Sequence, residues 1–233
     1  MNRILCLAVV VILLGHTPAS SNDDAGWKQV KDRSDIKVYT RDVPGSDIDE
    51  FKGVGIVDAR LEVLATIMRD VSASKYWMAN TEHAEKIKQL EGEDMIVLNI
   101  TRLPWPLKLR ESLVLITVRM DYNKGYANID MQGINDTNLR PVSKTYVRMK
   151  YVHASVILEY IDREHTCVTY TARIDPGGNI PIDIANLFVV KIPFDSICSL
   201  RKLAAQEKFI TAGRNSKDRI IIDQNVALGY LKP

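Results

Sequence analysis

The stretch Asp175-Pro176-Gly177-Gly178-Asn179-Ile180-Pro181 decides the fold of this chain, because two different patterns meet at it. Residues 167–174, which precede it, are mostly β-branched or aromatic and predict a strand. Residues 181–208, which follow it, are largely apolar and predict a long helix. Pro-Gly-Gly ends a strand, and a proline at the first helical position starts a helix. The chain is therefore predicted to pass directly from a last strand into a last helix.

The last helix is apolar around most of its circumference in its first half. A helix that covers a core with one face only would show a single apolar stripe. Pro193 is expected to kink or split the helix, because proline lacks the N–H that continues the hydrogen-bond ladder. The apolar side chains of the first half are Ile184, Leu187, Phe188, Val189, Val190 and Ile192.

The rest of the chain predicts a sheet with one helical interruption. Apolar residues recur at helical spacing over 61–71, and a short segment with Tyr76 and Trp77 follows. Turn residues at hairpin-length spacing separate the later strands, which indicates an antiparallel meander. This order predicts an α+β fold in which a curved antiparallel sheet grips the long C-terminal helix. The predicted strands are 36–40, 51–57, 86–90, 95–103, 112–121, 125–134, 145–161 and 166–174.

The strand over 112–121 is apolar on both faces at its start. Leu113 and Leu115 share one face, whereas Val114 and Ile116 share the other. A sheet with one wet face would alternate apolar and polar residues. Either helices cover the outer face of the sheet, or its inner face lines an apolar hollow.

Two glycines lie inside the strand predicted over 51–57. Gly53-Val54-Gly55 matches part of a dinucleotide-binding fingerprint, but the third glycine and the glycine-rich turn are missing. We therefore interpret these glycines as a place where another backbone packs closely against the strand.

The totals describe one globular domain. The chain has 233 residues and a formal net charge of +2, with no basic block that would indicate nucleic-acid binding. We divide it into a signal peptide (1–21), a ligand-binding domain (22–210) and a C-terminal tail (211–233).

The N-terminus predicts a secretory signal peptide. Arg3 supplies the positive charge, residues 4–14 form a short apolar core, and residues 17–21 supply small side chains for cleavage. Eleven apolar residues are too few to span a bilayer as a helix, although an uncleaved anchor remains the alternative. A periplasmic or secreted protein is expected. Cys167 and Cys198 would then remain, and we interpret them as two buried thiols, while an oxidising compartment leaves their pairing open.

Several motifs occur in an order that resembles the START domain, the lipid-transfer module related to the steroidogenic acute regulatory protein. The resemblance covers roughly residues 27–208, with Glu111 where the family usually has Asp. The long N-terminal helix of the family is absent or reduced here. The motifs are Trp27, Ile36-Lys37-Val38-Tyr39, Tyr76-Trp77-Met78, Trp105-Pro106-Leu107-Lys108-Leu109-Arg110-Glu111, Tyr146-Val147-Arg148 and the stretch 175–181.

The resemblance implies a helix-grip fold with an apolar tunnel between the sheet and the C-terminal helix. One lipid, such as a phospholipid, a fatty acid or a sterol-like molecule, would lie in the tunnel. The loop over 103–109 and the helix would form the gate, and the protein would act as a monomer in transient contact with membranes. The residues proposed to contact the ligand are Trp77, Trp105, Arg110, Tyr151, Tyr170, Arg173, Ile184, Leu187 and Phe188.

Each of these residues also has a structural alternative. Trp105 either touches a membrane or caps the core. Arg110 either forms a salt bridge, which we favour, or binds a lipid head group. For Trp77, Tyr151, Tyr170 and Arg173, packing in the core or sheet is the alternative.

Catalysis has little support in the sequence. The motifs of metalloproteases, redox enzymes, serine hydrolases and P-loop enzymes are missing, so no metal or cofactor is expected. A cyclase or hydrolase acting in the same hollow remains the alternative function, because a fold does not fix an activity. A sensing domain without transfer activity is a third possibility.

Overall fold

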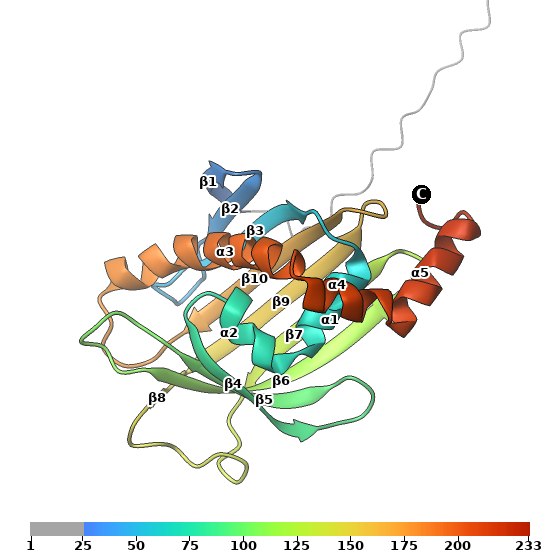
Figure 1. Ribbon diagram of the computed structural model, residues 1–233. Helices are drawn as coiled ribbons and strands as arrows, with labels where there is room; N and C mark the ends of the chain where they lie inside the picture. The colour runs from blue at the N-terminus through green and yellow to red at the C-terminus, as the bar shows by residue number, and fades with distance from the viewer. Residues whose placement is uncertain (1–25) are drawn as a thin grey trace, which may run out of the picture.

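Figure 1 shows the computed structural model, which describes residues 26–233. The predicted signal peptide therefore lies outside the described residues. Ten strands form one curved sheet in the order β1-β2-β3-β10-β9-β7-β6-β5-β4, with β8 paired to β6. All pairs are antiparallel except β6 with β8. The strands are β1 (Lys28–Arg33), β2 (Ile36–Arg41), β3 (Glu50–Val57), β4 (Thr81–Gln89), β5 (Met95–Thr101), β6 (Arg110–Asp121), β7 (Tyr126–Ile134), β8 (Val147–Arg148), β9 (Tyr151–Tyr160) and β10 (Thr166–Asp175).

The helices cover the concave face of this sheet, and α3 runs across it (Figure 1). Helix α3 packs against β2, β3 and β10, and it also contacts α2, which closes the space beneath it. This arrangement confirms the predicted helix-grip fold. The helices are α1 (Leu61–Arg69), the 3-10 turn η2 (Val71–Ala73), α2 (Ser74–Trp77), α3 (Ile182–Ala204), α4 (Glu207–Arg214) and α5 (Lys217–Ala227). Within residues 26–233, no helix has both the length and the hydropathy needed to cross a bilayer.

The passage from β10 to α3 has the predicted form. Strand β10 ends at Asp175, and α3 begins at Ile182, immediately after Pro181. Gly177 and Gly178 have φ angles of 65° and 71°, a left-handed conformation that glycine adopts without steric cost. The Asp175 carboxylate accepts a hydrogen bond of 2.8 Å from the N–H of Gly177, which closes the turn.

Pro193 does not split the last helix. Helix α3 continues through Pro193 and ends at Ala204, so of the two expected effects, a kink or a split, the split does not occur. Proline costs one backbone hydrogen bond, but here its ring is buried against β3. A Cβ placed on Gly55 would lie 3.0 Å from Ile197 in the next turn of α3. The prediction that these strand glycines mark close backbone packing is therefore confirmed.

Three of the strands differ from the prediction. Strand β1 was not predicted, because its residues are mostly exposed and polar. The strand expected over 145–161 is interrupted at residues 149–150, between β8 and β9. Strand β4 starts at Thr81 rather than at 86, in a segment without regular alternation.

The residues predicted as a tail after 210 are helical and contribute to the core. Ile222 and Val226 of α5 belong to the main hydrophobic cluster of the protein. Ion pairs fix α5 to α1: Arg69 to Asp218, and Arg60 to Asp223. The helical pattern of α5 is hard to recognise in the sequence, because charged residues also lie on its buried side. Asp218 is one of these, and it is fully buried.

The outer face of β6 is covered by a loop rather than by helices. Glu111 is fully buried there and pairs with Arg140 and Arg148. Its carboxylate also accepts a hydrogen bond from the backbone of Ser143. The loop between β7 and β8 is therefore tied down over the start of β6, so Leu113 is dry on the outer face while Val114 faces inward.

Candidate functional site

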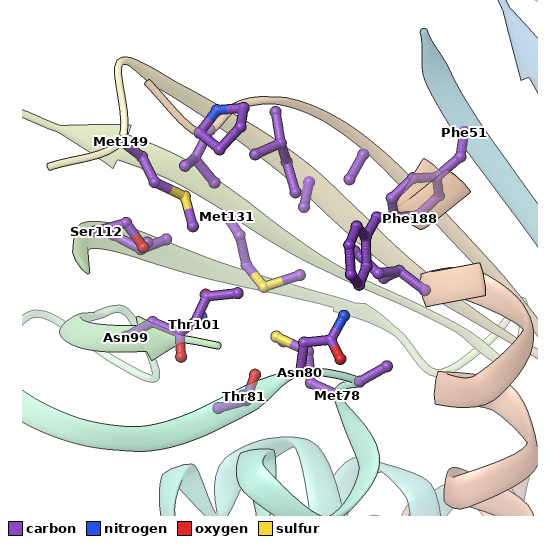
Figure 2. Close-up of a pocket in the computed structure, with 18 of the residues that line it drawn as sticks. Phe51, Met78, Asn80, Thr81, Asn99, Thr101, Ser112, Met131, Met149 and Phe188 are labelled. Atoms are coloured by element: carbon purple, nitrogen blue, oxygen red, sulfur yellow. The ribbon is translucent and has the colours of Figure 1, made fainter. Parts of the chain in front are cut away.

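A large cavity lies between the inner face of the sheet and the first half of α3. It contains about 1220 Å³ of space that no atom fills, including the part that opens to solvent. Figure 2 shows the side chains that line it from the strands, from α3 and from the turn before β4.

One cross-strand row forms the floor of this cavity. Ile116, Met131, Ala154, Ala172 and Phe51 are direct neighbours in register on β6, β7, β9, β10 and β3. All five side chains line the cavity, because residues in register on adjacent strands share a face. Their mixture of large and small residues leaves a concave apolar surface.

Helix α3 forms the apolar roof of the cavity. Its lining residues are spaced three or four apart, so they lie on one face of the helix. They are Ala185, Phe188, Val189 and Ile192. Three methionines also line the cavity, Met78, Met131 and Met149, and such unbranched side chains adapt to ligands of different shape.

The wall formed by β4, β5 and β6 is polar at one end. Asn99 faces Ser112 across the β5–β6 pair, and Thr81 faces Thr101 across the β4–β5 pair. All four line the cavity, where Figure 2 shows them together on one side. The side-chain oxygen of Asn99 is buried and has no hydrogen-bond partner among the described residues. A buried polar atom without a partner costs free energy, so this end of the wall is suited to a polar group of a ligand.

An aromatic cluster closes the opposite side of the cavity. The rings of Phe51 and Tyr170 are 5.1 Å apart and meet edge to face. Trp77 packs behind Tyr170 at 6.1 Å. Burial raises the pKa of the Tyr170 hydroxyl well above its ordinary value, so this side chain stays neutral.

Of the nine side chains predicted to contact a ligand, the structure brings Tyr170 and Phe188 into the cavity lining. Trp77 is buried outside the lining and packs against Tyr170. Ile184 and Leu187 lie on α3 outside the lining, and Leu187 is 63% exposed. These two side chains do not line the cavity, because only one face of α3 is turned toward the sheet.

Tyr151 and Arg173 lie outside the lining, on the outer face of the sheet. Val152 and Ala172, their neighbours in sequence, line the cavity, so side-chain alternation turns Tyr151 and Arg173 outward. The Arg173 guanidinium lies 4.9 Å above the ring of Tyr151, a cation–π contact between β9 and β10. A prediction of which strand residues face inward needs the register, which the sequence did not provide.

Trp105 and Arg110, from the same segment, have opposite environments. Trp105 is 92% exposed on the loop between β5 and β6, so it does not cap the core. Arg110 is 2% exposed and donates hydrogen bonds to the backbone oxygens of Pro176 and Gly177, at 3.2 and 3.0 Å. It does not form the salt bridge that we favoured, and its burial lowers its pKa. Arg110 instead fixes the start of β6 to the turn that leads into α3.

The loop between β5 and β6 and the turn before α3 connect the cavity with the surface. Leu103, from the loop between β5 and β6, and Ile180, from the turn before α3, both line the cavity. Trp105 and Ile182 follow them closely in sequence and are exposed by 92% and 49%. Exposed apolar side chains thus lie directly beside residues that close the cavity.

The histidines and cysteines of the described chain lie outside the cavity lining. His153 is half-exposed and contacts Asp130 at 3.0 Å across the β7–β9 pair. His165 lies in the β9–β10 turn, where its hydrogen bond to Asp162 raises its pKa. Cys167 and Cys198 are free thiols and half-buried, as we interpreted them, although less deeply than expected. Among the described residues that line the cavity, Asp49 is the one charged residue.

Comparison with known proteins agrees with this architecture. Residues 19–202 match the START domain family, which is well over half of the chain. The chain belongs to the START domain family. A crystallised fragment of a STAR-related lipid transfer protein from Xanthomonas axonopodis is 29% identical, with a TM-score of 0.70. That match covers 78% of this chain and 99% of the fragment.

The chain is also similar to further proteins from bacteria and humans. An uncharacterised protein of Pseudomonas aeruginosa is 28% identical over 76% of this chain and 86% of its own length. Human START domain-containing protein 10 is 24% identical over 70% of this chain, which spans 56% of that protein. The crystal structure of human STARD10 has the same fold, with a TM-score of 0.71, and the match covers 80% of this chain and 76% of that structure.

The polar residues of the cavity were missed by the sequence analysis. The sequence nevertheless contains an indication of them. Asn99 and Thr101 lie on the same face of the strand as Val97, and the strand is otherwise apolar. Polar residues on the inward face of such a strand are unusual. Without the register of β5, however, that face could not be assigned to the cavity.

Proposed function

We propose that this protein binds one hydrophobic lipid in the cavity and exchanges it at membranes. The observation that carries the proposal is the apolar cavity between the sheet and α3, in a chain of a family with structurally characterised lipid transfer proteins. Each methylene removed from water contributes about 0.8 kcal/mol, so a chain of sixteen carbons would gain roughly 12 kcal/mol before costs. The apolar space between the sheet and α3 offers such a chain a place outside the bilayer.

Exchange requires the cavity to open, and the loop over 102–109 with the start of α3 is the proposed gate. Leu103 and Phe188 line the cavity from these two segments, while Trp105 and Leu187 of the same segments are exposed. Tryptophan favours the interface between lipid head groups and acyl chains. In the proposed mechanism, the gate touches a membrane through these exposed side chains and opens there.

Arg110 ties the two segments of this gate together at their base. Its guanidinium joins the end of the loop to the backbone of the turn before α3. Because the two segments are tied at their base, a membrane contact at Trp105 would act on both segments together. The rest of the cavity wall belongs to the sheet, which would remain in place.

Binding without chemical conversion is the simplest use of this lining. Within the described chain, Asp49 and Tyr170 are the titratable side chains that line the cavity, and burial keeps Tyr170 protonated. Neither is hydrogen-bonded through its side chain to a second catalytic group among the described residues. A nucleophile or general base needs such a partner.

The proposed location of this activity is outside the cytoplasm. The proposal rests on the charged, apolar and small residues of segment 1–21, which form the pattern of a secretory signal peptide. A monomer suffices for the proposed exchange, because one chain contains the cavity and the gate. Size-exclusion chromatography with light scattering would test the monomer, and sequencing of the mature N-terminus from the native host would test cleavage.

The decisive experiment has two parts. Protein purified from its native host is extracted with organic solvent, and the extract is analysed by mass spectrometry. About one lipid per chain is expected, and recovery of none would contradict the proposal. Transfer between donor and acceptor vesicles is then measured with the same lipid. Binding without any acceleration of transfer would support a sensing domain instead of a carrier.

A further inference from the structure

We infer that the cavity selects an uncharged lipid that carries a hydroxyl group, which Asn99 and its polar neighbours bind. The inference rests on the proposed function, because it assigns the ligand of the same cavity. It begins with the Asn99 side-chain oxygen, which is buried and has no hydrogen-bond partner among the described residues. An amide oxygen accepts hydrogen bonds, so the missing partner is a donor.

The neighbours of Asn99 can bind the same group. Ser112 is its direct neighbour on β6, and Thr101 lies two residues along β5 on the same face. The hydroxyls of Ser112, Thr81 and Thr101 form no hydrogen bond within residues 26–233, and all three line the cavity. A ligand hydroxyl both donates and accepts, so it could satisfy Asn99 and a neighbouring hydroxyl together.

The position of this polar wall gives the ligand an orientation. Moving along β5 and β6 from the apolar floor, the pair Val97–Val114 comes next and the pair Asn99–Ser112 follows. Asn99 and Met95, which is paired with Ile116 of the floor, are separated by four residues, or about 13 Å of strand. Strand β5 then ends at Thr101, where the gate loop begins. The polar end of the ligand would therefore point to the gate, and its hydrocarbon would lie on the floor.

The charges of the cavity argue against an ionised head group. Among the described lining residues there is no lysine, arginine or histidine, and Asp49 is an acid. An ionised group that loses water without gaining a partner of opposite charge pays a large desolvation cost. A phosphate or carboxylate would therefore be excluded from this wall, while a hydroxyl would not.

Three lipids that differ in one group test this inference. Dioleoylglycerol has a free hydroxyl, its acetate ester has no donor, and dioleoylphosphatidate has a phosphate in the same place. Delipidated full-length protein is incubated with vesicles that contain equal amounts of all three, repurified and analysed by native mass spectrometry. We expect dioleoylglycerol in at least about tenfold excess over each of the others, since one hydrogen bond or one avoided charge suffices for that ratio.

The variant Asn99→Leu removes the acceptor and keeps the size of the side chain. It should bind dioleoylglycerol about tenfold more weakly and lose the preference over the acetate ester. It should also unfold at a higher temperature in the ligand-free form, because the unpaired buried oxygen of Asn99 is replaced by an apolar group. The control, Gln132→Leu, also replaces an amide side chain by leucine, on β7 at a residue that faces outward and is exposed. It should bind as the wild type does.

The outcomes separate this inference from the proposed function. If wild-type protein takes up none of the three lipids, nor any lipid from its host, the proposed function fails. If it takes up lipids but binds phosphatidate or the acetate ester as well as dioleoylglycerol, the inference alone fails. Unchanged selectivity in Asn99→Leu would overturn it equally. Loss of binding in Gln132→Leu as well would show that Asn99 has no specific role.

Discussion

Pro193 of α3 lies directly over Gly53 of β3, so closely that a Cβ placed on Gly53 would lie 2.7 Å from the Cβ of Pro193. Real Cβ atoms do not approach one another to that distance, so only glycine fits at this crossing. The contact sets the distance between α3 and the sheet on one side. On the other side, toward β6 and β7, the same helix stands away from the sheet and leaves the cavity beneath it.

The substitution Gly53→Ala should therefore destabilise the protein by about 1–3 kcal/mol, because the added methyl group overpacks the crossing. Urea denaturation followed by circular dichroism measures the free energy of unfolding. In a Pro193→Gly background the same substitution should cost clearly less, since the opposing Cβ is gone. Equal costs in both backgrounds would show that the two residues do not oppose each other.

A second prediction concerns the exposed tryptophan of the gate. Trp105→Asp should slow lipid transfer between vesicles by about fivefold or more, because a charge replaces a side chain suited to the membrane interface. The thermal stability should stay unchanged, because Trp105 is 92% exposed. Fluorescence dequenching of a labelled lipid reports the rate.

Leu228→Asp is the matched control for the tryptophan variant. Leu228 is 70% exposed and lies after α5, near the C-terminus, which Figure 1 shows at the end of the molecule away from the start of α3. It should transfer lipid at the wild-type rate. Equal rates for Trp105→Asp and wild type would remove Trp105 from the membrane contact.

A third prediction fills the cavity. Ala172→Phe places a large ring on the cavity floor, so the lipid recovered per chain should fall to about a third or less. The free energy of unfolding should fall by about 1–3 kcal/mol, because Ala172 belongs to the main hydrophobic cluster and the ring overpacks it. Thr171→Phe, the outward neighbour on β10, should keep its lipid. Full occupancy in Ala172→Phe would mean that the lipid lies elsewhere.

A fourth prediction concerns the buried guanidinium of Arg110. Arg110→Met should lower stability by about 2–4 kcal/mol, because the backbone oxygens of Pro176 and Gly177 lose their donor inside the protein. Arg102→Met removes an exposed pair with Glu82 and should cost less than about 1 kcal/mol. Denaturation of the two variants under the same conditions makes the comparison. Similar costs would contradict the role assigned to Arg110, which ties the two segments of the gate together.

A fifth prediction concerns alkaline pH. Burial and a hydrogen bond to Asp218 raise the pKa of Tyr122 from 10.0 to about 12. Between these values the unfolded chain releases the Tyr122 proton while the folded chain keeps it, so the stability from this group is lost as the pH rises. Below pH 10 the contribution is fully present, and Tyr122→Phe should cost about 1.5–3 kcal/mol there.

The comparison of variant and wild type across that pH range isolates the tyrosine from other alkaline titrations. The difference in stability between the two proteins should shrink as the pH rises from 10 toward 12. Chemical denaturation at closely spaced pH values measures it. A difference that stays constant would show that the hydroxyl of Tyr122 does not bind the Asp218 carboxylate.

The order of elements was predictable because it depends on local chemistry. Pro176, Gly177 and Gly178 end β10 and turn the chain, and Pro181 precedes the first residue of α3. Hairpin spacing gave the antiparallel sheet, and the all-round apolar first half of α3 showed that this helix does not cover a core with one face only. The small residues Gly53 and Gly55 signalled a close approach, although not which element approaches.

The cavity residues were not predictable in the same way, because they depend on register and on helix rotation. A shift of one residue in β9 or β10 exchanges the two faces of the strand, and this difference separates Ala172 from Arg173. Leu187 and Phe188 are adjacent and both apolar, yet only Phe188 lines the cavity. The sequence by itself determined most of the strands, their order and the passage from the last strand into α3. Only the tertiary structure decided which side chains meet inside it, because contacts between distant strands follow from packing.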